Sequence, residues 1–275
     1  MTIWKPTVLT RVMLGMAIVL SAFPLYWMLV IASRTNSDAV SVPPALLPGG
    51  NLGDNIVAVL THPEAQFVQG LTNSFIVATV VTISVIFIST LAGFAFANLN
   101  FKGRNALLLL VLLTMAVPLQ QMGVVPLYRL MVALDWTNTL KAVILPYLLN
   151  GFGVFLMTQY TRQSVPMELV EAARVDGAAT LRIWWNVVLP AVRPGMAVLG
   201  INTFMLMWND YMWPLIVANQ NPTVQIAINS LNARFSTEYS LIFAGTALSI
   251  IPLIVVFVLF GRQIVGGLME GAVKA

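Results

Sequence analysis

The sequence predicts an all-α membrane protein with six transmembrane helices. Of its 275 residues, 59% are hydrophobic and only 9% are charged, whereas soluble domains carry roughly 25% charged residues. A soluble fold could not bury so much apolar surface, because its exterior must be covered by groups that water tolerates. Lipid is therefore the main solvent of this chain.

Six apolar runs are long enough to span, since a helix needs about 20 apolar residues to cross the hydrocarbon core. The first run is too long for the core of a signal peptide and no small-residue cleavage site follows it, so we expect it to be retained. Five runs carry no charge, and the fifth contains Asp210, which places the end of its helix near Met207. The six are residues 12–32, 71–97, 106–128, 142–160, 194–217 and 241–261.

The distribution of Lys and Arg predicts the orientation. With the N-terminus in the cytoplasm, the inner segments hold 10 of the 14 basic residues and the outer segments hold 4. This is the bias that cytoplasmic loops carry, and six spans then place both termini inside. The net charge of +4 is thus interpreted as membrane orientation, and no nucleic-acid partner is expected. The outer segment 33–70 is rich in turn residues and predicts a loop with short helices.

The inner segment 164–190, between the fourth and fifth spans, predicts two short helices. Pro166 suits the first turn of a helix, and Gly177 suits a left-handed stop. Thr180 is expected to cap the second helix, which Pro190 ends or kinks. The first helix has about three turns, which is too short for stability alone, so it must dock on another surface.

Two docking surfaces fit these helices. Trp184 and Trp185 favour the lipid headgroup region for the second helix. Ala172 and Ala173 instead give the first helix a face small enough for a close protein partner. The residues by themselves leave the two surfaces equally open.

A longer pattern resembles a known signature. Glu171-Ala172-Ala173 is followed by three residues, Gly177, nine residues and Val187-x-Leu-Pro. This resembles the cytoplasmic signature of binding-protein-dependent ABC importer permeases, with Val187 in place of Ile. In that family the loop forms a coupling helix in a groove of the ATPase subunit. The coupling residues that the resemblance implies are Glu171, Ala172, Ala173, Arg174, Asp176, Gly177, Leu189 and Pro190.

Other motifs resemble the second permease of maltose-type carbohydrate importers over nearly the whole chain. The resemblance implies a single transmembrane permease domain over residues 1–275, in the cytoplasmic (inner) membrane of a prokaryote. It implies half of the translocation pathway for a sugar or sugar-like solute, with a glycerophospho-compound as the alternative. The motifs lie at residues 101–104, 138–139, 144–147, 208–214 and 267–274.

The chain lacks a G-x-x-x-x-G-K-[ST] phosphate loop, so it cannot bind ATP in that way. We expect no enzyme activity and no cofactor in this chain, with ATP and Mg bound by a dimer of partner ATPase subunits. The resemblance also implies a second, homologous permease and an extracytoplasmic solute-binding protein. With no Cys and one histidine, His62, thiolate and histidine-cluster metal sites are excluded. An ion-coupled transporter would want acidic groups at membrane depth, and only Asp210 lies near the membrane.

Polar groups within the spans are candidates for the solute pathway, although they also serve to bond helix to helix. Sugars need hydrogen-bonding groups together with aromatic faces. Both roles remain open for the candidates, which are Gln120, Asn150, Trp208, Asn209 and Trp213.

Overall fold

The computed structural model describes residues 7–116, 123–232 and 237–272, and every regular element in these ranges is helical. The chain divides into two compact units. The first comprises Met1–Val68 and Ala227–Ile251, and the second comprises Gln69–Ile226 and Pro252–Ala275. The single permease domain expected for residues 1–275 stays a prediction.

The first unit contains α1 (Val8–Ala32), α2 (Asn36–Ala39), α3 (Leu52–Thr61) and the first part of α16 (Tyr239–Ala272). Helix α1 begins where the Thr7 hydroxyl accepts a hydrogen bond from the Thr10 N–H at 3.2 Å, a common capping arrangement. Most of its side chains are exposed and apolar, as expected for a helix that faces lipid or another membrane subunit.

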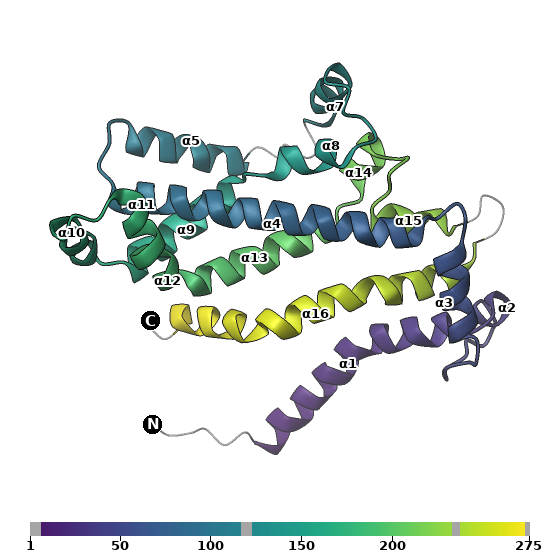
Figure 1. Ribbon diagram of the computed structural model, residues 1–275. Helices are drawn as coiled ribbons and strands as arrows, with labels where there is room; N and C mark the ends of the chain where they lie inside the picture. The colour runs from purple at the N-terminus through teal and green to yellow at the C-terminus, as the bar shows by residue number, and fades with distance from the viewer. Residues whose placement is uncertain (1–6, 117–122, 233–236, 273–275) are drawn as a thin grey trace. The chain divides into compact units, whose positions relative to one another are not determined.

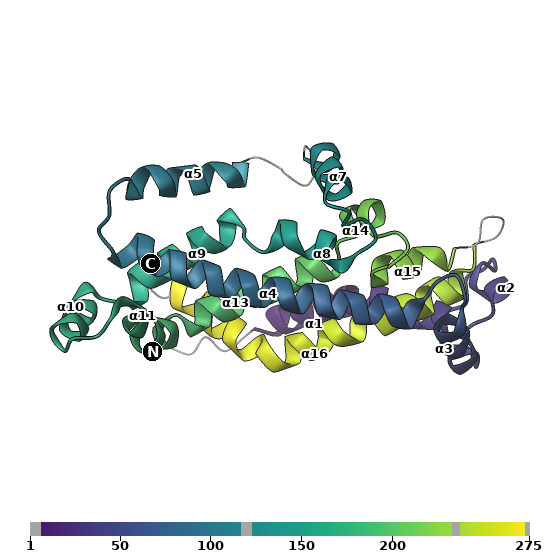
Figure 2. The same ribbon diagram turned by 45° about the horizontal axis from the view of Figure 1, so that its top comes forward.

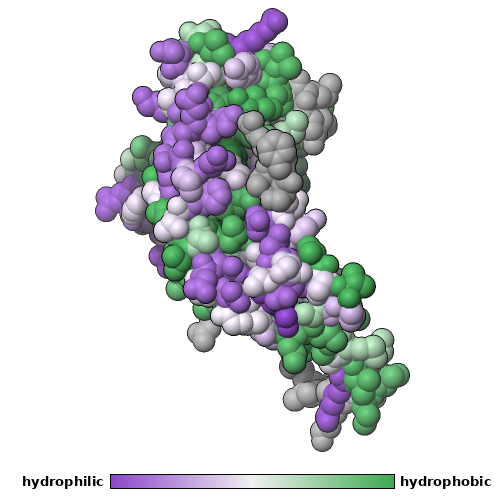
Figure 3. Space-filling view, turned by 90° about the vertical axis from the view of Figure 1, so that its right-hand side faces the viewer, coloured by the Kyte–Doolittle hydropathy of each residue, from purple (hydrophilic) through white to green (hydrophobic). Residues whose placement is uncertain are grey.

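The segment between α1 and α4 folds into short helices, as the sequence predicted. Arg34 donates from Nε and Nη2 to the carbonyl of Leu47, at 3.0 and 2.7 Å, which fixes the loop after α2. The Asn36 amide donates to the Thr237 carbonyl and accepts from the Tyr239 N–H, which fixes the start of α16. Figure 3 looks at the end of the molecule where Figure 1 places α2 and α3, and many residues on that face are hydrophilic.

The second unit is built around α4 (Phe67–Asn98), a helix of 32 residues. The other elements that begin in this unit follow in chain order. They are α5 (Arg104–Ala116), α7 (Val124–Ala133), α8 (Leu140–Ile144), the 3₁₀ turn η1 (Leu145–Tyr147), α9 (Gly151–Ser164), α10 (Met167–Val175), α11 (Thr180–Ile183), the π-helical turn η2 (Trp184–Val188), α12 (Leu189–Ala191), α13 (Arg193–Trp208), α14 (Met212–Val217) and α15 (Val224–Ser230).

Helices α4, α9 and α13 approach one another closely at glycines. A Cβ on Gly93 would lie 2.7 Å from the carbonyl carbon of Met157 in α9, and one on Gly200 would lie 3.0 Å from Ile86 in α4. Small residues of this kind let helix backbones approach in membranes. Figures 1 and 2 show α10 at one end of this unit and α14 at the other.

Three described helices are long and apolar enough to cross a membrane: α1, α4 and α16. Two helix pairs pass the same test together but are bent, by 43° between Tyr147 and Gly151 and by 79° between Ala191 and Arg193. The predicted span 106–128 includes residues 117–122, which lie outside the described residues. Six spans therefore stay a prediction.

The predicted fifth span, 194–217, is not one continuous helix. Helix α13 ends at Trp208, one residue after the predicted end at Met207, and α14 begins at Met212. The break contains Asp210. The sequence-based expectation that this charge marks the end of the helix is confirmed.

Candidate functional site

The segment with the importer signature begins where α9 ends. The Val165 N–H donates to the Thr161 carbonyl at 2.9 Å, and Pro166 then occupies the N-cap position of α10. Pro166 thus lies at the start of the helix, as predicted. Val170 is fully buried and holds α10 against the rest of its unit.

Helix α10 ends in a Schellman motif. Gly177 has a φ of +76°, the Gly177 N–H donates to the Arg174 carbonyl at 3.0 Å, and the Ala178 N–H donates to the Ala173 carbonyl at 2.9 Å. These two bonds satisfy carbonyls that a helix end otherwise leaves free. The predicted left-handed stop at Gly177 is confirmed. No atom lies within 4 Å of the position that a Cβ would take on this glycine, so the requirement for Gly is conformational.

Most of α10 faces outward. Glu171, Ala172, Arg174 and Asp176 are exposed, and Ala173 is half-buried. Apolar side chains are exposed beside them, because Leu169 is more than half exposed and Val175 is 88% exposed. A short helix that exposes apolar and charged groups together is suited to protein contact.

The second helix of the segment corrects one prediction. Ala179 is the N-cap residue of α11 and no side chain caps this helix, so the predicted cap by Thr180 is wrong: Thr180 is the first helical residue. The two tryptophans also differ. Trp184 is 5% exposed and its ring packs edge-on against Phe87, with centroids 5.6 Å apart, whereas Trp185 is 63% exposed. Of the pair, Trp185 is therefore the one placed to meet a headgroup region.

Leu189 and Pro190 lie in α12, which follows the π-helical turn η2. The Leu189 N–H donates to the Trp184 carbonyl, five residues earlier, and Pro190 has no N–H with which to continue the ladder. Helix α12 ends one residue later, and the chain bends by 79° into α13. The predicted end or kink at Pro190 is thereby confirmed.

The predicted pathway residues occupy different surroundings. Asn150 caps α9 by accepting a hydrogen bond from the Gly153 N–H at 2.6 Å. Trp208 is 1% exposed and stacks on Phe204, and Trp213 is buried with its Nε1 donating to the Ala142 carbonyl. Gln120 lies outside the described residues. Asn209 is exposed and lines a cavity beside α13. The pathway role of all five residues stays a prediction.

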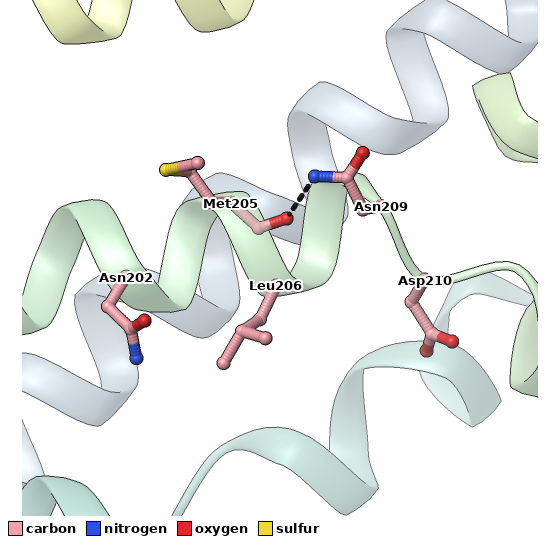
Figure 4. Close-up of a pocket in the computed structure, with 5 residues that line it drawn as sticks. All are labelled: Asn202, Met205, Leu206, Asn209 and Asp210. Carbon is pink, nitrogen blue, oxygen red and sulfur yellow. Dashed lines mark hydrogen bonds between the residues drawn. The ribbon is translucent and has the colours of Figure 1, made fainter.

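The cavity has a volume of about 420 Å³ and lies along one face of α13 (Figure 4). Four of its lining residues follow the spacing i, i+3, i+4, i+7, which places them on one side of a helix. Away from this side of the helix, Phe204, Met207 and Trp208 are buried. The lining residues are Asn202, Met205, Leu206, Asn209 and Asp210.

The polar groups of the cavity are partly held by the protein. The Asn209 amide donates to the Met205 carbonyl at 2.8 Å, drawn as a dashed line in Figure 4. Asp210 accepts hydrogen bonds from the Tyr147 side chain and from the Trp213 backbone. Its Oδ2 atom is buried and has no hydrogen-bond partner among the described residues. Sequence reasoning missed the contact with Tyr147, although both residues lie in motifs that it singled out.

The cavity has the chemistry of a site for a small polar molecule. Two amides and one carboxylate supply donors and acceptors, and Met205 and Leu206 supply apolar surface, which is the usual mixture in ligand sites. None of the five lining residues is basic. Within the described ranges no three His, Cys, Asp or Glu side chains gather into a potential metal site.

Comparison with known proteins assigns the family. The family model described as "Binding-protein-dependent transport system inner membrane component" matches residues 86–268. The chain belongs to this family. The matched region includes the α10 segment, α13 and the cavity. Both candidate sites, the α10 segment and the cavity along α13, therefore lie within it.

Relatives match over nearly the full length of this inner membrane component. The arabinooligosaccharides transport system permease protein AraQ of Halalkalibacterium halodurans is 31% identical, over 93% of this chain and 92% of its own. The lactose transport system permease protein LacG of Rhizobium radiobacter is 33% identical, over 98% and 97%. The sn-glycerol-3-phosphate transport system permease protein UgpE of Yersinia enterocolitica is 30% identical, over 94% and 95%.

A solved structure shares the fold. It is the crystal structure of a bacterial ABC transporter involved in the import of the acidic polysaccharide alginate. A chain of that structure matches with a TM-score of 0.80 at 18% identity, covering 94% of this protein and 95% of that chain.

Proposed function

We propose that this protein is the permease subunit of an ATP-driven importer and forms half of the pathway for a sugar or sugar-like solute. The observation that carries the proposal is the family match together with end-to-end similarity to permeases named for arabinooligosaccharides and lactose. The permeases named for sn-glycerol 3-phosphate are similar to nearly the same extent, so a glycerophospho-compound is the second candidate solute.

The α10 segment is proposed as the contact with the ATPase. Its buried anchor, its closed end at Gly177 and its exposed face all support a docking role. Glu171, Ala172 and Arg174 are proposed to lie at the contact, and Asp176 to flank it. Leu189 and Pro190 would connect the contact to α13, so that movement of the ATPase reaches the pathway.

Six spans with both termini in the cytoplasm are proposed for the topology. Figure 1 places the α4–α5 loop and the start of α13 at the same end of the second unit as α10. That end carries the positive charge expected of a cytoplasmic side. The basic residues in these segments are Lys102, Arg104, Arg162, Arg174, Arg182 and Arg193.

The partners follow from this role. The complex would contain a second, homologous permease, a dimer of ATPase subunits that binds ATP and Mg, and a solute-binding protein on the outer side. The inner membrane is the location that the family description names.

The proposal is tested by reconstitution. A tagged permease, expressed with the proteins encoded beside it, should retain an ATPase in detergent and give ATP-dependent uptake of a neutral sugar in proteoliposomes. The solutes to compare are lactose, arabinooligosaccharides and sn-glycerol 3-phosphate. Uptake driven by an ion gradient without ATP would contradict the proposal, and ATP-dependent uptake of sn-glycerol 3-phosphate alone would support the second candidate solute.

A further inference from the structure

The exposed face of α13 is unsuited to lipid. Asn202 and Asn209 lie at the two ends of a stripe that also includes Met205 and Leu206, and all four side chains are exposed. Polar side chains at membrane depth normally face a bundle interior or a water-filled cavity. Because the opposite face of α13 is buried in its own unit, this stripe is free to face a water-filled pathway.

Asp210 extends the stripe just beyond the end of α13 (Figure 4). Its two internal hydrogen bonds, from the Tyr147 side chain and the Trp213 backbone, hold the carboxylate in place. They leave Oδ2 without a partner among the described residues. A buried acceptor that lacks a hydrogen bond is costly. Because Asp210 lines the cavity, a rotation of its side chain would bring this oxygen to a solute hydroxyl there.

The residues that line the cavity carry negative charge and no positive charge. The cavity contains one carboxylate, and none of its five lining residues is Lys or Arg, so a phosphate or carboxylate group entering it would meet a like charge without a compensating cation. Sites that bind phosphate supply Arg, Lys or clustered backbone N–H groups. Here the side-chain donors of the lining are the neutral amides of Asn202 and Asn209, and Met205 takes one of the two N–H groups of Asn209.

We propose that the cavity along α13 is a subsite for a neutral, hydroxyl-bearing solute, in which Asp210 accepts a solute hydroxyl and disfavours anions. This inference rests on the proposed function and narrows it. It favours the neutral sugars over sn-glycerol 3-phosphate for this chain. Asn202 and Asn209 contact the solute beside Asp210, and Tyr147 acts as a positioning residue.

The test uses the assembled permease pair with its ATPase in lipid nanodiscs, without the binding protein, so that the pathway itself selects the probe. The probes are radiolabelled lactose and arabinobiose, together with the anomeric phosphate of each. The neutral sugars should bind the wild-type complex, and their phosphates should bind at least about tenfold more weakly. Asp210→Asn should weaken binding of the neutral sugars by about tenfold, the loss expected for a hydrogen bond to a charged group, and should narrow the discrimination against the phosphates.

Two control variants separate charge from structure. Tyr147→Phe removes one internal hydrogen bond and keeps the charge, so discrimination between each sugar and its phosphate should remain. Asp135→Asn makes the same chemical change at an exposed residue just after α7, and binding should not change. The discrimination should also shrink as ionic strength rises, since it is electrostatic.

The subsite is overturned if the phosphates bind the wild-type complex as well as the neutral sugars do. It is equally overturned if no neutral sugar binds, or if Asp210→Asn leaves the ratio of affinities unchanged in a complex that assembles normally. The proposed function is judged separately by ATP-dependent uptake with the binding protein present. Normal sugar uptake combined with an unchanged ratio would remove the subsite and leave the permease function standing.

Discussion

Helices α10 and α13 end in two different ways. At the end of α10, Gly177 and Ala178 satisfy the last carbonyls within the helix itself, and the exposed surface that remains is partly apolar. At the end of α13 the apolar side chains Met207 and Trp208 are buried, and a carboxylate oxygen of Asp210 is left without a partner among the described residues. The first end has its last carbonyls satisfied and suits a protein surface, whereas the second leaves one polar side-chain atom unsatisfied.

The largest effect is expected at the exposed charge of α10. Glu171→Lys should reduce retention of the ATPase by about 30-fold or more, because loss of one partner from an interfacial charge pair costs about 2–5 kcal/mol. Uptake should fall with it. The measurement is ATPase recovery with tagged permease in detergent. Glu64→Lys, the same reversal at an exposed residue of the first unit, should leave ATPase recovery unchanged, and equal recovery in both variants would remove α10 from the contact.

At the end of α13, neighbouring residues should respond in opposite ways. Trp208→Ala should destabilise the protein by about 3–5 kcal/mol, the usual cost of removing a buried aromatic side chain, and the amount of folded permease in the membrane should fall. Asn209→Ala should leave that amount unchanged and lower uptake per complex. Immunoblotting of membranes, paired with uptake, separates the two. Normal uptake by the Asn209→Ala variant would contradict a role for Asn209 in the solute pathway.

Gly177 and Gly103 form a matched pair of glycines for testing the coupling segment. Both glycines have positive φ, +76° and +83°, and at neither does any atom lie within 4 Å of the position that a Cβ would take. Alanine should therefore cost each site about 1–2 kcal/mol of backbone strain. Only Gly177→Ala should lower solute-stimulated ATP hydrolysis in liposomes. A similar loss in Gly103→Ala would mean that local strain, and not the position on the coupling segment, causes the defect.

The smallest effect concerns capping. Thr180→Ala should change the free energy of unfolding by less than about 0.5 kcal/mol, as expected for a surface site without a special contact. Asn150→Ala should cost about 1 kcal/mol, because its side chain caps α9. Thermal unfolding in detergent measures both. A marked loss in Thr180→Ala would restore the cap that the sequence predicted.

The sequence predicted features that depend on a few neighbouring residues. Gly177 stops α10 because a left-handed residue closes a helix locally, and Asp210 ends α13 because a charge interrupts an apolar run. The cap at Thr180 was wrong by one position, since Ala179 adopts the extended conformation that precedes α11. These are effects of local backbone conformation.

Burial and helix breaks were harder to predict from the sequence. An aromatic ring suits a sugar and a core equally, so the sequence did not indicate that Trp208 is buried. Its stacking on Phe204, four residues earlier on the same helix, follows from their spacing. The bend within 142–160 was also missed, because the hydropathy of the run stays high across Pro146 and Gly151. Asn150, an N-capping residue directly before Gly151, is the signal that would have located the start of α9.

The close approach of α4 to α9 and α13 has a mechanical consequence. Gly93 lies against the Met157 backbone and Gly200 against Ile86, so the three helices have little room to slide and tend to move as one rigid body. Helix α13 has 16 residues and is about 24 Å long. Used as a lever arm pivoting near α12, it would carry its far end about 0.4 Å for each degree of rotation. A tilt of several degrees at the α10 end is therefore enough to move Asp210, just beyond the far end of α13, by more than an ångström.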